Sequence, residues 1–491
     1  MGKAFSRRDV VRFGLMGAGG GALAACGATP TPQVVEKVVT SIVEREVTKM
    51  VEGTPQVVKE TVVVEQTVEK VVEIVVTPTA ASVAGPVTIR FTHVADPGEL
   101  EIMQASIADF EAANPDVKVV AELVPEDGMD EKITTMVAGG AAPDAVYVHP
   151  SFVPLWAEQG VLLPQNDFAD NDPDFGASDF FPETLGYFVS GGKVYGYPYY
   201  SGPSVTYFNQ DAFEAAGVPL PSDTAAGFAE DSDKWTWEAL LEAALPLTTG
   251  EGATKTFGYW GTSPSLHWIN IAIWGYGGDV WDKEMATCML TESGSVDAIQ
   301  FQVDLYVKNN VAPQPAQAEG MPDGFSGGKV GMLYGIRGHV PGLKNVEFRI
   351  GTAPIPRGPK GRFCRNGPNA VGIIKQTRFA EAAWKLCKYM AGPKPGELGG
   401  QKFQFELQRA VPSRASLFDS PDFVDNLLPW ESADVYRNAA EHVRAFPLPA
   451  RYGEIQRAWR EQWDLMLLGQ TTVKDGVAAA CTAIDEFLAP V

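Results

Sequence analysis

The chain has 491 residues, of which 45% are hydrophobic, so it is long enough for two or more domains and apolar enough for a globular core. Its net charge of −22 argues against a nucleic-acid-binding protein, because such a surface needs an excess of Lys and Arg. The same charge argues against adsorption to anionic lipid headgroups, and beyond that it indicates little more than a soluble surface.

The first 26 residues have the pattern of an export signal. Arg7 and Arg8 precede an apolar stretch over residues 13–25, which is too short to span a membrane. Small residues then lead to Cys26, as in the lipobox of bacterial lipoproteins. We therefore expect a signal peptide over 1–26, Tat-type export and lipidation of Cys26. Sec export and a plain signal peptide are the alternatives.

Residues 27–85 are low in complexity, rich in Val, Thr, Glu, Lys and Pro and almost free of aromatic residues. This composition predicts a mobile spacer between the membrane and a folded domain. Val64, Val68, Val71 and Val75 have helical spacing, so a short coiled-coil stalk is the alternative.

The other four cysteines, Cys288, Cys364, Cys387 and Cys481, form no CxxC pair and no short metal-binding spacing. Folding in the reducing cytosol before export would disfavour disulfides, although one or two are compatible with the sequence. Cys387 lies in an amphipathic helical pattern, which predicts a buried thiol.

The region from about residue 86 onward alternates strand and helix patterns. Strands are expected at 87–91, 117–121 and 145–148, and helices at 99–114 and 130–138. This order predicts an α/β fold with a mainly parallel sheet flanked by helices. In such sheets ligands bind at the carboxyl ends of the strands, where His93, Asp96, His149 and Ser151 follow predicted strands.

Four phrases, taken together in their order and spacing, are typical of one known family. The segments 192–200, 206–218, 235–240 and 325–332 resemble the signature segments of family 1 extracellular solute-binding proteins, which include maltose- and glycerol-phosphate-binding components of ABC importers. The resemblance spans about residues 87–488. It implies a two-lobed periplasmic-binding-protein-like fold with a hinge of two or three crossovers and an interlobe cleft that closes on the ligand.

The same resemblance places the lobe boundaries. Lobe one is expected to comprise residues 86–197 and 348–392, and lobe two residues 198–347 and 393–491. A protein of this kind is not an enzyme, needs no cofactor or metal, and acts as an extracytoplasmic monomer with the permease subunits of an importer as partners.

Sugar sites combine aromatic faces with polar groups that bind hydroxyls. Trp274, followed by glycines and Asp279, is the main candidate, with packing in the core as its alternative. Tyr199, Tyr200 and Ser201 lie where the chain is expected to cross between lobes. The remaining candidates occur near predicted strand or helix ends, and they are Trp268, Tyr334, Arg337 and Asn369. Trp459 and Trp463, four residues apart on a helix, are expected to pack in the core.

Two other functions stay open. No GxSxG, P-loop or HExxH motif occurs and the five histidines are scattered, but the many acidic residues leave room for a glycosidase-type carboxylate pair. A surface adhesin or sensor would share the signal and the spacer.

Overall fold

The computed structural model describes residues 38–51, 54–67, 85–94, 97–125, 128–221, 234–261, 265–321, 324–449 and 451–488. The predicted signal peptide, Cys26 and Asp96 lie outside these residues. The chain divides into two compact units, Met1–Ser82 and Val83–Val491, which are described separately.

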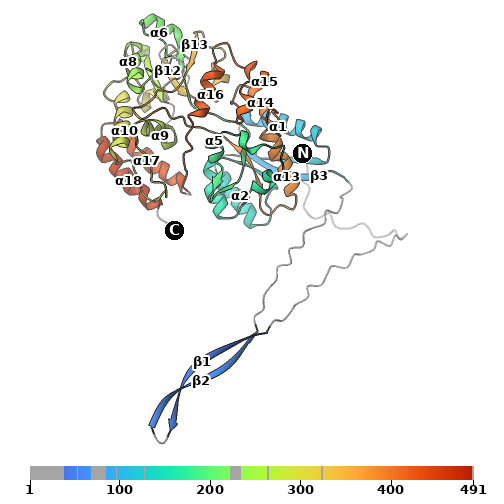
Figure 1. The fold of residues 1–491 in the computed structure, drawn as a ribbon. Coiled ribbons are helices and arrows are strands. Elements are labelled where there is room, and N and C mark those ends of the chain that lie inside the picture. Colours follow the sequence, from blue (N-terminus) through green and yellow to red (C-terminus); the bar gives the residue numbers. More distant parts are fainter. Residues whose placement is uncertain are drawn as a thin grey trace, which may run out of the picture. The chain divides into compact units, whose positions relative to one another are not determined.

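In the first unit, β1 (Val38–Val51) and β2 (Thr54–Thr67) form an antiparallel hairpin in which Val38 pairs with Thr67 and Val51 with Thr54 (Figure 1). A helical stalk is therefore wrong over these residues. The dense β-branched content explains this result, because such side chains favour strands over helices. The mobility of the spacer stays a prediction.

The second unit contains two main sheets. In the first sheet the strand order is β4-β3-β5-β14-β6, and β9 also pairs with β14. The strands are β3 (Val87–Val94), β4 (Val117–Val124), β5 (Ala145–Val148), β6 (Leu162–Leu163), β9 (Tyr197–Pro198) and β14 (Ala370–Ile374). A short hairpin, β7 (Val189–Ser190) with β8 (Lys193–Val194), precedes β9.

The second sheet has the order β11-β12-β10-β13. Its strands are β10 (Val205–Asn209), β11 (Phe257–Gly261), β12 (Val330–Gly335) and β13 (Ile350–Ala353).

The α/β class is confirmed, but the expectation of mainly parallel sheets is wrong. β3 runs parallel to β4 and β5, and β11 runs parallel to β12. In contrast, β14 is antiparallel to each of its partners, and β10 is antiparallel to both β12 and β13. The reason is topological: β10 and β14 enter their sheets from the other sheet rather than through a local strand–helix–strand unit.

Helices cover the first sheet. Those in contact with its strands are α1 (Pro97–Ala113), α3 (Val153–Glu158), α5 (Pro182–Gly186) and α13 (Ala380–Met390), and α14 (Gln401–Glu406) packs on α1. Ile89, Phe91 and Trp384 belong to a hydrophobic cluster on one side, whereas Val146 and Val148 belong to a second, larger cluster. Both faces of this sheet are therefore buried. Cys387 of α13 is a buried free thiol, as predicted.

A second group of helices accompanies the other sheet. α8 (Trp237–Leu247) and α16 (Ala433–Glu441) contact its strands, while α9 (Leu266–Gly275), α10 (Ser293–Tyr306), α17 (Tyr452–Leu467) and α18 (Val473–Leu488) pack on one another (Figure 1). Thr236 caps α8, because its hydroxyl accepts a hydrogen bond from the Ala239 amide at 3.2 Å. Trp459 and Trp463 are buried in this group, which confirms their packing role.

The remaining helices are shorter or peripheral. They are α2 (Met129–Ala138), α4 (Asn166–Asp170), α6 (Gln210–Ala216), α11 (Pro315–Glu319), α12 (Val340–Leu343) and α15 (Pro421–Val424). Among the described helices, none is both long and apolar enough to cross a membrane.

A disulfide joins Cys288 to Cys481, 193 residues apart, and so connects the segment before α10 to α18. The Cys288 amide also donates to Asp485 of the same helix at 2.7 Å. The sequence left the pairing open, and Cys364, like Cys387, is a buried free thiol.

Candidate functional site

The two sheets are connected by chain segments that lie side by side. Residues 199–204 lead from β9 to β10, and residues 354–369 lead from β13 back to β14. The Tyr199 amide donates to the Asn369 carbonyl at 3.0 Å, and the Ser204 amide donates to the Arg365 carbonyl at 3.1 Å. Ser201 exchanges two backbone hydrogen bonds of 2.9 Å with Val411, in the segment that runs from α13 toward α16.

Asn366 binds these segments together. Its side-chain oxygen accepts from the Gly202 amide at 2.7 Å, and its amide nitrogen donates to Ser201 at 2.9 Å and to Thr184 at 2.8 Å. Asn366 is fully buried, so these bonds are shielded from water. The connection between the lobes is thus a set of hydrogen-bonded crossovers around one buried amide.

Beside Asn366, the Arg365 guanidinium lies over the ring of Trp268, 4.1 Å from its centroid. Trp268 occupies the first turn of α9, and its ring also meets that of Tyr334, at the end of β12, with 4.8 Å between centroids. Two predicted ligand residues, Trp268 and Tyr334, are therefore in contact at the carboxyl end of a strand. A cavity of about 30 Å³ borders both residues, with room for about one or two water molecules.

Neutral polar side chains surround this guanidinium. Burial together with the charge of Arg365 lowers the pKa of His149 to about 4, and the same two causes lower the pKa of His267 well below its ordinary value. Burial raises the pKa of Tyr187 to about 12, with the charge of Arg365 opposing the shift. The Tyr187 hydroxyl lies 3.3 Å from Nε2 of His267. At neutral pH these side chains carry no charge, so Arg365 is the cation of the group.

Tyr199 and Tyr200 differ in burial, although their rings meet edge to face with 5.0 Å between centroids. Tyr199 is buried in the cluster of the first sheet. Tyr200 is half-buried, and its hydroxyl accepts a hydrogen bond from the side-chain amide of Asn369. The side chain of Ser201 bonds Asn366. Tyr200 and Asn369 are thus the better placed of these candidates for a ligand.

His149 and Ser151 follow β5 of the first sheet, as predicted, whereas His93 lies within β3, which extends to Val94 beyond the predicted strand end at residue 91. The ring of His149 contacts the Ser151 hydroxyl at 2.7 Å. His93 is fully buried at the end of β3, where its ring stacks on Phe91 with 5.6 Å between centroids, and burial lowers its pKa to about 4. The surroundings of His93 are those of a core residue.

Trp274 is 1% exposed and packs in the hydrophobic core at the end of α9. Its indole nitrogen donates to Asp279 at 2.9 Å, and Asp279 also accepts from Arg444 at 2.6 Å. The Arg444 guanidinium lies 4.4 Å from the ring centroid. This geometry supports the packing alternative for Trp274 and gives the carboxylate of Asp279 two side-chain partners within the protein, beside the Val280 amide, which donates to it at 3.0 Å.

Arg337 is also buried among protein partners. It pairs with Glu431 at 2.9 Å and donates to the carbonyls of Ala410 at 2.7 Å and Asn426 at 2.9 Å. Because its side chain is fully buried and bonded, nothing in this geometry supports a ligand contact.

The site residues that the sequence reasoning did not select are Arg365, Asn366, His267 and Tyr187. The polar run Arg365–Asn369 between two strands was the available signal, but only Asn369 was chosen from it.

The described residues contain no cluster of three or more His, Cys, Asp or Glu side chains that could hold a metal ion. Larger cavities of about 330, 490 and 830 Å³ are lined by none of the predicted ligand residues.

A fold of two α/β lobes with a polar and aromatic group beside the crossovers is that of a solute-binding protein. A family model described as bacterial extracellular solute-binding protein matches residues 95–397. This match covers more than half of the chain, so the protein belongs to that family, and the resemblance seen in its sequence is confirmed.

Relatives and solved structures agree with this assignment. An arabinooligosaccharide-binding protein of Halalkalibacterium halodurans is 24% identical over 361 residues, which cover 70% of this chain and 74% of the relative. An ABC substrate-binding protein of Listeria monocytogenes, solved with cycloalternan, superposes with a TM-score of 0.70 at 22% identity and covers 82% of this chain and 98% of its own. The maltose-bound MalE3 protein of T. maritima gives a TM-score of 0.65 at 22% identity, covering 82% and 100%. These similarities confirm the two-lobed fold.

Proposed function

We propose that the protein is an exported solute-binding protein that closes its two lobes on a carbohydrate and delivers it, chemically unchanged, to an ABC importer. The observation that carries the proposal is the set of hydrogen-bonded crossovers with Trp268, Tyr334, Tyr200 and Asn369 beside it. Small backbone rotations in such crossovers would open and close the space between the lobes. The names of the relatives, which include oligosaccharide-binding proteins, support a sugar as the solute.

A carbohydrate panel tests this proposal by thermal shift. A ligand at 100 times its Kd adds about 2.7 kcal/mol to the stability of the folded state. We expect a clear rise in melting temperature with at least one sugar and a smaller radius of gyration in small-angle scattering when that sugar is bound. Chromatography of the recovered sugar distinguishes binding from hydrolysis, because a glycosidase would return shortened products. If no mono- or oligosaccharide raised the melting temperature, the proposal that the solute is a carbohydrate would be rejected.

The anchor forms a separate part of the proposal. The small residues before Cys26 support lipidation of its thiol, with the first unit as a spacer that holds the binding unit away from the membrane. Wild type is expected in the membrane fraction and Cys26→Ala in the soluble fraction; equal pelleting of both would contradict lipidation. A truncated protein that begins at Pro86 is expected to bind its sugar with unchanged affinity.

A further inference from the structure

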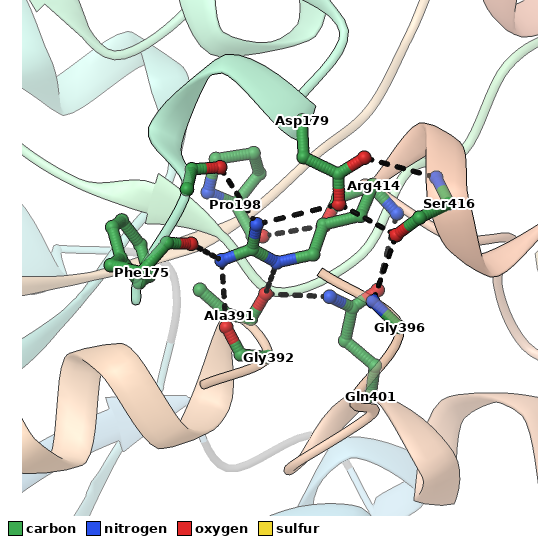
Figure 2. A network of polar contacts seen from close by, with 11 residues as sticks. Phe175, Asp179, Pro198, Ala391, Gly392, Gly396, Gln401, Arg414 and Ser416 are labelled. Atoms are coloured by element: carbon green, nitrogen blue, oxygen red, sulfur yellow. Dashed lines mark hydrogen bonds and ion pairs between the residues drawn. The ribbon is translucent and has the colours of Figure 1, made fainter. Parts of the chain in front are cut away.

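Three of the buried arginines, Arg337, Arg365 and Arg414, differ in how their charge is compensated. Arg337 pairs with Glu431 and with two carbonyl groups. Arg414 is fully buried as well, and Figure 2 shows its guanidinium surrounded by oxygen atoms. Its partners are the carbonyls of Phe175, Gly176, Ala391 and Gly392 and the carboxylate of Asp179. Both of these arginines therefore have the partners that a structural cation needs.

Arg365 is the exception. It is 7% exposed, but its guanidinium makes one hydrogen bond, of 3.3 Å, to the carbonyl of the adjacent Asn366. Its Nε has no partner among the described residues, and none of the described carboxylates pairs with it. The ring of Trp268 compensates part of the charge through a cation–π contact. A guanidinium with unused donors and no counter-ion is costly to bury, so an anion that binds there would restore the missing interactions.

The neighbourhood is suited to a negative group from outside. The charge of Arg365 acts on Tyr187 and Tyr452, which are buried hydroxyls, and on His149 and His267, which are neutral at pH 7. With a net charge of −22 the chain as a whole repels anions, so an anionic solute requires a local cation. Arginine meets this need well, because its planar fork can bind two oxygens of a carboxylate or phosphate at once.

We propose that Arg365 binds an anionic group of the solute, and hence that the protein selects carbohydrates that carry a carboxylate or a phosphate over their neutral counterparts. The inference deepens the proposed function and rests on it, since the guanidinium becomes accessible when the lobes open. Trp268 holds the guanidinium in place from one face and leaves its edge for the oxygens of the solute.

Matched acidic and neutral sugars test the selectivity of the full-length protein. The probes are galacturonate and glucuronate, galactose and glucose, short oligomers of each, and glucose 6-phosphate, all titrated calorimetrically at pH 7. We expect at least one acidic sugar to bind about tenfold or more tightly than its neutral counterpart, as a charge-assisted hydrogen bond allows. Uronates and the sugar phosphate distinguish a carboxylate from a phosphate as the bound group. A neutral sugar that binds as tightly as its acidic counterpart overturns the inference and leaves the proposed function standing. If no sugar of either kind binds, both fall.

Variants assign the selectivity to Arg365. Arg365→Gln is expected to remove the preference for the acidic sugar, whereas Arg365→Lys retains the charge without the fork and keeps a reduced preference. Unchanged selectivity in folded Arg365→Gln would overturn the inference.

Arg414→Gln is the matched control, because it alters a buried arginine whose partners are all protein groups. We expect Arg414→Gln to lower the melting temperature and, in the folded fraction, to keep the wild-type selectivity. Arg365→Gln is expected to melt at or above the wild-type temperature without ligand, and a marked loss of stability there would instead indicate a structural cation.

Discussion

Arg337 and Glu431 form a salt bridge of 2.9 Å in which both side chains are fully buried. Glu431 also accepts a hydrogen bond from the Tyr436 hydroxyl at 2.7 Å, and that hydroxyl lies 3.0 Å from the hydroxyl of Tyr207 on β10. The salt bridge between Arg337 and Glu431 therefore helps to connect the second sheet to the segment before α16. The guanidinium of Arg337 thus has its partners within the protein.

Replacing Arg337 by Ala should strongly destabilise the fold. The change leaves the Glu431 carboxylate buried without its cation, which typically costs about 3–5 kcal/mol. Urea unfolding monitored by circular dichroism measures the loss. The double variant Arg337→Met with Glu431→Leu should recover part of it, because no unpaired charge is left inside. An Arg337→Ala protein that is as stable as the wild type but no longer binds the sugar would instead show that Arg337 contacts the ligand.

Reduction of the Cys288–Cys481 disulfide should lower the free energy of unfolding by about 2–4 kcal/mol, because the bond closes a long loop in the unfolded chain. The measurement compares denaturation with and without dithiothreitol. In the Cys288→Ala/Cys481→Ala double variant the effect of reductant should vanish. Cys364→Ala, which removes a free buried thiol, should be destabilised by the reductant as much as the wild type is. Equal stability of the wild type in both conditions would contradict the contribution of this bond.

Local patterns predicted much of the fold. The strands around Ile89, Val119 and Ala145 and the helix that contains Cys387 each depend on a few neighbouring residues, and all are present. The direction of β14 was not predictable in this way, because it depends on a chain that leaves the first sheet at residue 198 and returns at 370.

The site was harder to predict because identical residue types have different partners. Arg337, Arg365 and Arg414 look alike in the sequence, yet the carboxylate that neutralises Arg337 is 94 residues away. Only the fold reveals that no carboxylate of the described residues pairs with Arg365. Trp268 and Trp274 lie on one short helix, yet the ring of Trp268 lies against the Arg365 guanidinium and is partly buried, whereas that of Trp274 is buried in the core.

His93 should make the fold less stable in mild acid. Burial lowers its pKa to about 4 in the folded state, from an ordinary value near 6.5, so the unfolded chain binds this proton more tightly. Above about pH 6.5 His93 is neutral in both states and takes nothing from the free energy of unfolding. As the pH drops from about 6.5 toward about 4, protonation of the unfolded chain lowers that free energy, and below about 4 the loss levels off. Unfolding free energies of wild type and His93→Phe between pH 7 and 4 test this, and the variant should show the shallower decline. Parallel curves would show that His93 does not titrate as inferred.

Trp274→Ala decides between the two roles that the sequence left open for this residue. The ring is 1% exposed, and its indole nitrogen donates to Asp279, so removal leaves a cavity and takes away one of the partners of that carboxylate. We expect a loss of about 3–5 kcal/mol in the free energy of unfolding without ligand, the usual range for a buried tryptophan. Trp274→Phe keeps most of the packing and lacks only the hydrogen bond, so it should lose much less. Sugar affinity, measured by calorimetry on the folded fraction, should stay close to wild type in both variants. A Trp274→Ala protein with wild-type stability and greatly weakened sugar binding would show instead that this ring stacks on the solute, in a conformation in which the lobes expose it.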